Sequence, residues 1–236
     1  MIQPKNKLTH LDNELHKLKA ESIKMWALVL KQLHKSRTSL VNIDKDLARE
    51  VILSEKRVNA FELKIDRDCE DIFALFTPVA VDLRFLLAVL KINMNLERTG
   101  DNAETIAQSV VDLPAHFDRK LLEITRVVEM FDQANIMISD VMHAFDKEDT
   151  LIARKTFKKD DLLDEINDNS TAIITEYIAS NLDKNLTGQA LYIYSIIRKL
   201  ERVGDQAKNI AEEIIFYSEA KVLKHQPKGK KSGLDE

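Results

Sequence analysis

Glycine and proline are scarce in this chain, which has five glycines and four prolines among 236 residues. All-β proteins need many tight turns and use these residues heavily, so their scarcity argues against a strand-rich fold and favours long helices. Cysteine is scarcer still. The single cysteine, Cys69, excludes an internal disulfide and a cysteine-rich zinc site, and it is typical of a reducing compartment.

Long apolar runs are also missing. The longest, such as FLLAVL at 85–90, are too short to span a bilayer, and the N-terminal segment has no apolar stretch of signal-peptide type. We therefore expect a cytoplasmic protein without membrane insertion. The formal net charge of -4 gives no general electrostatic reason to bind nucleic acid, and we expect the basic segment 224–236 to be a disordered, solvated tail.

What the chain does contain is a long internal repeat. The stretch LERTGDNAETIAQSV at 96–110 returns as LERVGDQAKNIAEEI at 200–214, and the two copies are identical at 8 of 15 positions. A separation of 104 residues is too long for a solenoid repeat and indicates a duplicated subdomain.

Apolar residues recur at spacings of three and four throughout, which predicts amphipathic helices. Five breaks divide the chain into six long helices: KSRTS (35–39), FTPV (76–79), DLPAH (112–116), DKEDT (146–150) and DKNLTG (183–188). Thr77 is expected to cap a helix that starts with Pro78, and Thr187 to cap the last helix. The expected helices are 5–35, 39–75, 78–111, 114–146, 149–182 and 187–223. The predicted fold is all-α, with two pseudo-symmetric three-helix bundles at 5–111 and 114–223.

Paired acids recur on four of these helices. In the repeated stretches they face outward, opposite the apolar seams, and in the helices before them they lie beside the seams, so any metal cluster is expected on the surface of the bundles. The repeated stretch carries Glu97 with Asp101 in its first copy and Glu201 with Asp205 in its second. The helices before them carry Glu62 with Asp66 and Asp160 with Asp164, in what we read as the same register. Carboxylates brought together repel unless a cation or an arginine such as Arg98 or Arg202 neutralises them. The pattern therefore leaves two interpretations open, a metal site and a solvated acidic face.

Gly100 and Gly204 recur inside the repeated helices, where each costs about 1 kcal/mol relative to alanine. Close packing against a neighbouring helix and room for a ligand beside the following aspartate both explain a glycine at this position.

At these residues the sequence resembles the PhoU family of phosphate-transport accessory and regulatory proteins. PVAVDLRFLLAVLKINMNLERTGDNAETIA (78–107) is similar to the family pattern P-x-A-x-D-L-R followed by L-E-R-I-G-D-x-A-x-N-I-A. EKRVNAFELKIDRDCEDI (55–72) and LERVGDQAKNIAEE (200–213) extend the resemblance, which covers about residues 10 to 217.

The resemblance implies two three-helix bundles, a homodimer, and metal clusters at the E(D)xxxD motifs Glu62/Asp66 with Glu97/Asp101 and Asp160/Asp164 with Glu201/Asp205. Oxygen ligands suit hard or borderline cations, and iron, manganese, magnesium and zinc remain open. Thr105 and Gln108 of the first copy stand where the second has Asn209 and Glu212, so we expect tighter metal binding in the second copy.

The family's usual role is to contact the ATPase of the phosphate ABC transporter and a phosphate-sensing histidine kinase, which damps phosphate uptake and the phosphate-starvation response. The leading hypothesis is therefore a non-enzymatic negative regulator of phosphate homeostasis. The sequence has no recognisable catalytic triad, phosphate-binding glycine loop or Rossmann fingerprint. Two alternatives remain, a metal or phosphate buffering protein without such partners and a carboxylate-bridged metalloenzyme.

Overall fold

The structure is a computed structural model and describes residues 10–113 and 117–222. These residues form eight α-helices and no strand, which confirms the all-α prediction. The helices are α1 (His10–Asn42), α2 (Lys45–Leu75), α3 (Val81–Asp112), α4 (Arg119–Thr125), α5 (Val127–Lys147), α6 (Thr150–Lys159), α7 (Asp161–Ser180) and α8 (Lys184–Glu219). No helix in the described ranges is both long and apolar enough to cross a membrane.

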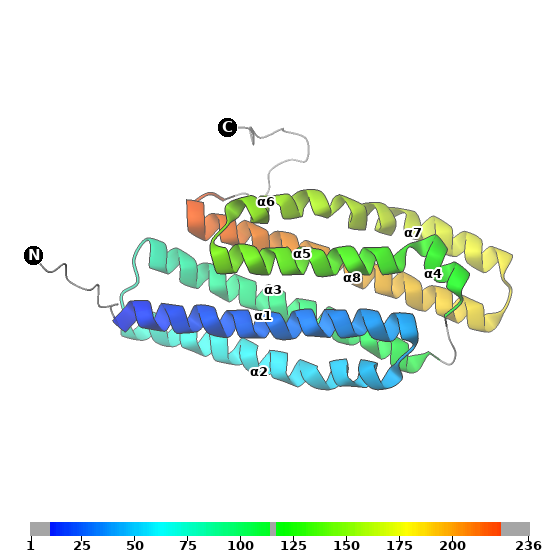
Figure 1. Cartoon of the computed structure of the whole chain (residues 1–236), viewed down its shortest axis with the longest axis horizontal. Helices are drawn as coiled ribbons and strands as arrows, with labels where there is room; N and C mark the ends of the chain where they lie inside the picture. The colour runs from blue at the N-terminus through cyan, green and yellow to red at the C-terminus, as the bar shows by residue number, and fades with distance from the viewer. Residues whose placement is uncertain (1–9, 114–116, 223–236) are drawn as a thin grey trace, which may run out of the picture.

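The helices lie side by side in one elongated bundle (Figure 1). We call α1–α3 the first half and α4–α8 the second half. The two halves meet mainly through α3 and α8, which run antiparallel at the centre. The side chain of Asn102 donates a hydrogen bond to Gln206 at 3.3 Å, and these two residues occupy the same position in the two copies of the repeat. The duplicated stretches therefore face each other across a pseudo-twofold axis.

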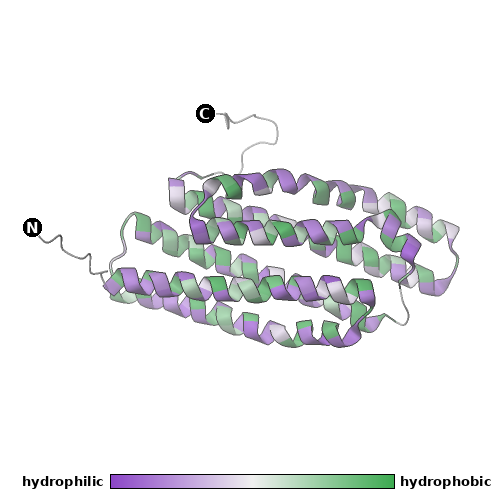
Figure 2. Ribbon diagram, in the orientation of Figure 1, coloured by the Kyte–Doolittle hydropathy of each residue, from purple (hydrophilic) through white to green (hydrophobic). Residues whose placement is uncertain are grey.

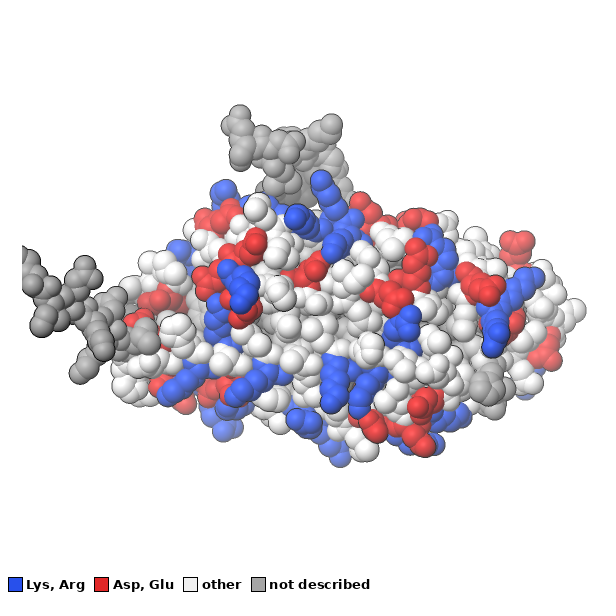
Figure 3. Space-filling view, viewed as in Figure 1, with Lys and Arg blue, Asp and Glu red and all other residues white. Residues whose placement is uncertain are grey.

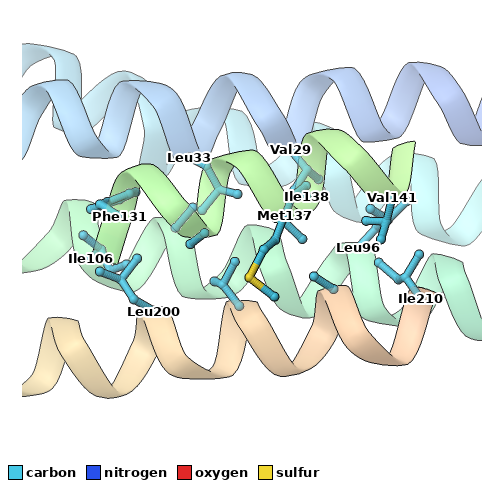
Figure 4. Packing of buried hydrophobic residues seen from close by; sticks show 14 of the residues in the cluster. Val29, Leu33, Leu96, Ile106, Phe131, Met137, Ile138, Val141, Leu200 and Ile210 are labelled. Atoms are coloured by element: carbon cyan, nitrogen blue, oxygen red, sulfur yellow. The ribbon is translucent and has the colours of Figure 1, made fainter. Parts of the chain in front are cut away.

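The core runs through both halves, because helices with apolar stripes must cover them against one another. In Figure 2 the apolar and polar residues alternate around each ribbon at helical spacing. Figure 4 shows side chains of α1, α3, α5 and α8 meeting in the interior, among them Leu33, Leu96, Met137 and Leu200, all with no exposed surface. Outside, positive and negative side chains are interspersed over the face shown in Figure 3.

Trp26 joins the two halves within this core. Its ring is fully buried and lies 5.6 Å from the ring of Phe145 on α5, measured between centroids. Its Nε1 donates a hydrogen bond of 3.1 Å to the carbonyl oxygen of Ile138, also on α5. A buried indole N–H needs such a partner, and here the partner belongs to the other half of the chain.

The first predicted break is wrong. Residues 35–39 continue α1 to Asn42, because the serines there satisfy their hydroxyls on backbone carbonyls instead of interrupting the helix. Ser36 donates to the carbonyl of Ala103 at 2.9 Å, and Ser39 donates to that of Ser36 at 2.8 Å. The turn comes later, at Asp44, whose side chain accepts a hydrogen bond from the N–H of Leu47 and caps α2.

Two predicted caps are also wrong. Thr77 and Pro78 lie before α3, which starts only at Val81 after Ala80, a residue with a positive φ of 43°. At the start of α8 the cap is Asp183, not Thr187, and its Oδ1 accepts hydrogen bonds from two backbone N–H groups. Because Asp183, four residues before Thr187, accepts from these first N–H groups, the helix starts earlier than predicted.

The two expected helices 114–146 and 149–182 are each divided. Arg126 separates α4 from α5 with a left-handed φ of 53°, and its guanidinium is held by ion pairs to Glu129 and Glu165. Asp160 separates α6 from α7. The predicted residues 5–9, 114–116 and 223, and the predicted tail 224–236, lie outside the described residues.

Candidate functional site

Six carboxylates lie in a row of about three helical turns where α2 packs against α3, and we call them the first acidic cluster. They are Glu55, Glu62 and Asp66 of α2 and Glu97, Asp101 and Glu104 of α3. Four of these, Glu62, Asp66, Glu97 and Asp101, are the predicted ligands of the first half, and the structure brings them together. Glu55 and Glu104 are additional.

Glu55 is the most buried member, with 4% of its surface exposed. Its Oε2 accepts a hydrogen bond of 2.8 Å from Nε2 of Gln32 on α1. Its Oε1 has no hydrogen-bond partner within the described chain, and neither has Oε1 of Gln32. A buried acceptor without a donor destabilises the folded protein by about 1 to 3 kcal/mol. A cation or a hydrogen-bond donor placed beside these two oxygens would remove that cost.

Asn93 of α3 adds a third acceptor of this kind. Its Nδ2 donates to the carbonyl of Glu62 at 3.0 Å and to Oδ1 of Asp66 at 2.8 Å, which fixes the amide between the two helices. Its Oδ1 is buried and finds no donor among the residues that the structure describes. The first acidic cluster is thus flanked at both ends by oxygen atoms that can still accept a bond.

The crowding of negative charge shows in the acidity of these groups. Burial raises the pKa of Glu55 to about 7, and the charges of Asp101, Glu104 and Glu97 add to the effect. Burial and the charges of Asp101 and Glu62 raise the pKa of Glu97 to about 7, and Arg98 offsets this only in part. Burial likewise raises the pKa of Glu62, with Asp66 and Asp101 contributing. Near neutral pH, part of this cluster therefore resists ionisation unless a cation is present.

The donor set of the first acidic cluster fits a hard or borderline cation. It offers carboxylate and amide oxygens, which Mg²⁺ and Mn²⁺ prefer over nitrogen or sulfur. Within residues 10–113 and 117–222, however, no group of three or more His, Cys, Asp and Glu side chains has the arrangement of a formed metal site. The cluster has the ligands of such a site without its closed coordination geometry.

The second half holds a matching but different group, the second acidic cluster. It contains four predicted residues: Asp160 at the N-cap of α7, Asp164 in the first turn of α7, and Glu201 and Asp205 of α8. The structure brings these four together as well. A lysine lies among them. Nζ of Lys208 forms an ion pair with the buried Asp160 and a second one, at 2.8 Å, with Asp205.

The two glycines show how the clusters correspond. A Cβ atom at Gly100 would lie 2.9 Å from Oε2 of Glu55, whereas one at Gly204 would lie 2.7 Å from Oδ1 of Asp160 and 2.6 Å from Cδ2 of Leu163. Glu55 therefore corresponds to Asp160. The register inferred from the sequence, which matched Glu62 with Asp160, is wrong by two helical turns. Both explanations of the glycines hold in part, because helix packing and an acidic side chain share the same space.

Sequence reasoning missed Glu55 and Lys208. Glu55 lies seven residues before Glu62 and so shares its helix face, a spacing that was available in the sequence. Lys208 stands where the first copy of the repeat has Glu104, and this reversal of charge between aligned positions was the available signal.

Known proteins with a similar sequence or fold all belong to one family. The family model of the PhoU domain matches twice, at residues 23–110 and 127–214. A protein of Thermotoga maritima described as phosphate-specific transport system accessory protein PhoU homolog 1 is 31% identical over 227 residues, with 96% of each chain covered. A PhoU homolog of Aquifex aeolicus is 33% identical, covering 92% of this chain and 96% of its own.

Solved structures agree with the sequence relatives. The crystal structure of PhoU from Pseudomonas aeruginosa matches with a TM-score of 0.83 and 28% identity, covering 90% of this chain and all of that one. The phosphate transport system regulatory protein PhoU from Streptococcus pneumoniae matches with a TM-score of 0.79 and 26% identity, covering 91% and 99%. The chain, with its duplicated helical halves, therefore belongs to the PhoU family.

Proposed function

We propose that this protein is a non-enzymatic regulator of phosphate uptake and of phosphate-starvation signalling on the cytoplasmic side of the membrane. The observation that carries this proposal is the doubled PhoU domain, similar over nearly the whole chain to proteins described as accessory to phosphate-specific transport. In this role the helical surfaces contact the ATPase of the phosphate transporter and a phosphate-sensing histidine kinase.

The first acidic cluster supports a second part of the proposal, that the regulator binds a metal cation. Glu62, Asp66, Glu97 and Asp101 would hold the cation, and its charge would offset that of Glu55, which lies two helical turns from Glu62 along α2. A cation there neutralises the mutual repulsion of the carboxylates, and it supplies a partner for an unpaired acceptor at its own end of the cluster. Such a site stiffens the packing of α2 against α3 and so fixes the surface that both helices present to a partner.

Changing Asp101 to asparagine tests the cluster with little change in size. We expect the Asp101→Asn protein to retain its helicity but to lose bound metal, measured by elemental analysis after purification without chelator. In cells that lack the native gene, wild-type protein should silence a phosphate-starvation reporter in phosphate-rich medium. The variant should leave the reporter partly active, because the docking surface is less well fixed.

The matched control is Asp112→Asn, at the far end of the same helix. It should behave as wild type in both assays. Association of the protein with the transporter ATPase is measured by co-purification from the same cells. If the protein binds metal but never associates with the ATPase or affects the reporter, it is a metal buffering protein and the regulatory proposal fails.

A further inference from the structure

The two copies of the repeat are unequal at one charged position. In the first copy Glu104 lies near Asp101 and Glu55, and its charge adds to the crowding there. The aligned residue of the second copy is Lys208, which lies against Asp205 and Asp160. Three carboxylates on one side thus correspond to two carboxylates and an ammonium group on the other.

The contacts of Lys208 are those of a built-in counter-ion. Its side chain is 24% exposed, and the side chain of Asp160 is only 6% exposed. A lysine ammonium group has donors and no acceptor, and here it presents them to carboxylates from two different elements.

A metal cation cannot share this position with an ammonium group, because the two positive charges would compete for the same oxygen atoms. The unpaired acceptors support the same distinction. The buried oxygens without a hydrogen-bond partner in the described residues, which belong to Gln32, Glu55 and Asn93, all flank the first acidic cluster. The lysine therefore leaves no place for a metal ion in the second cluster, whereas the first offers oxygen ligands and has a glutamate at the position aligned with the lysine.

We infer that Lys208 occupies the cation position of the second acidic cluster, so that the protein binds metal in its first half and is neutralised by its own side chain in its second. The inference rests on the proposed metal binding of the first cluster for the contrast between the halves. It reverses the expectation from the sequence that Glu201 and Asp205 form the tighter site, because that expectation counted ligands and overlooked the lysine.

Reversing the charge at each of the two aligned positions, 104 and 208, tests the inference. Binding of Mn²⁺ is measured by equilibrium dialysis on the full chain. We expect Lys208→Glu to bind more Mn²⁺ per chain than wild type, and we expect Asp205→Asn in that background to abolish the gain. Glu104→Lys should lose the Mn²⁺ bound by wild type. Lys158→Glu makes the same change of charge at an exposed position of α6 and should bind as wild type does.

Two results would overturn the inference. One is wild-type Mn²⁺ binding that falls as far with Asp205→Asn as with Asp101→Asn, and the other is no gain in Lys208→Glu. Failure of the proposed function has a different signature, namely wild-type protein that binds no Mn²⁺. Even then the gain in Lys208→Glu, reversed by Asp205→Asn, still decides the role of Lys208.

A second variant covers the case in which Lys208→Glu does not fold. Lys208→Gln removes the ammonium group without adding a charge, and it leaves Asp160 and Asp205 facing each other. Its Tm in chelator should be lower than that of wild type, and Mn²⁺ should restore it. A Tm that equals the wild-type value in chelator, or that Mn²⁺ does not raise, contradicts the inference.

Discussion

Replacing Glu55 by glutamine is expected to raise the free energy of unfolding of the metal-free protein by about 2 kcal/mol at pH 8. The carboxyl group is 4% exposed and has its pKa raised from 4.5 to about 7, so at pH 8 it is ionised in an unfavourable place. One pKa unit corresponds to about 1.4 kcal/mol, and the coupling of Glu55 to Glu97 reduces the share of either residue. A glutamine also provides a donor for the unpaired Oε1 of Gln32.

The sign of the pH dependence follows from the direction of the shift. A carboxyl group whose pKa is higher in the folded than in the unfolded state binds more protons when folded. Its stabilising contribution is complete below pH 4.5 and is lost as the pH rises through about 7. In chelator, the stability of wild type attributable to Glu55 and Glu97 therefore falls between about pH 5 and 8, and the curve for Glu55→Gln should be flatter.

Urea unfolding followed by circular dichroism at several pH values measures this difference. Glu70→Gln, at an exposed position of the same helix, is the matched control and should follow wild type. Saturating Mn²⁺ should stabilise wild type more than Glu55→Gln, because only the carboxylate gains a favourable partner. Equal stability of wild type and Glu55→Gln at pH 8 in chelator would show that burial of this carboxyl carries no cost.

Replacing Gly204 by alanine is expected to destabilise the protein by about 1 to 3 kcal/mol, the usual cost of overpacking a close-packed interior. The new methyl group would lie 2.6 Å from Cδ2 of Leu163 and 2.7 Å from Oδ1 of Asp160. Leu163 is fully buried and Asp160 is held by Lys208, so neither side chain has free space to move into. The strain should outweigh the gain in helix propensity that alanine brings.

The other glycines of the helices provide a graded comparison. Gly188, near the start of α8, has no atom within 4 Å of its would-be Cβ, so Gly188→Ala should stabilise by up to about 1 kcal/mol. Gly100→Ala should fall between the two, since its closest approach is 2.9 Å to the end of a side chain. The order of the three variants in Tm is the measurement, and a Gly204→Ala protein as stable as Gly188→Ala would disprove the packing argument.

The sequence was sufficient for the fold class and for the internal duplication, because helical periodicity and a 15-residue repeat are local signals. It was less reliable at the ends of the helices. The serines at 36 and 39 resemble a break in sequence, but in the folded chain one of them bonds to the carbonyl of Ala103, a residue of a different helix. Whether a polar residue ends a helix or packs inside it depends on such distant partners.

The candidate site was predicted in the same uneven way. The acids of the repeated stretch were found because their spacing is repeated. Lys208 was missed because the aligned residue Glu104 has the opposite charge, and Glu55 was missed because its counterpart Asp160 had been matched with Glu62. Matching the halves by acid pairs therefore produced a wrong register between α2 and α7. Only the packing of Gly100 and Gly204 against neighbouring helices shows which residues correspond.

The position of Trp26 gives the molecule an intrinsic fluorescent reporter. It is the single tryptophan of the chain, and it lies in the first half. Its indole N–H donates a hydrogen bond to a backbone carbonyl of the second half. Its emission therefore reports on the docking of the two halves, whereas far-ultraviolet dichroism reports on the helices themselves. If a partner or a cation loosens one half from the other without melting a helix, the emission shifts to longer wavelength while the dichroism stays constant. Rearrangement at the joint between the two copies can thus be followed in the unlabelled protein.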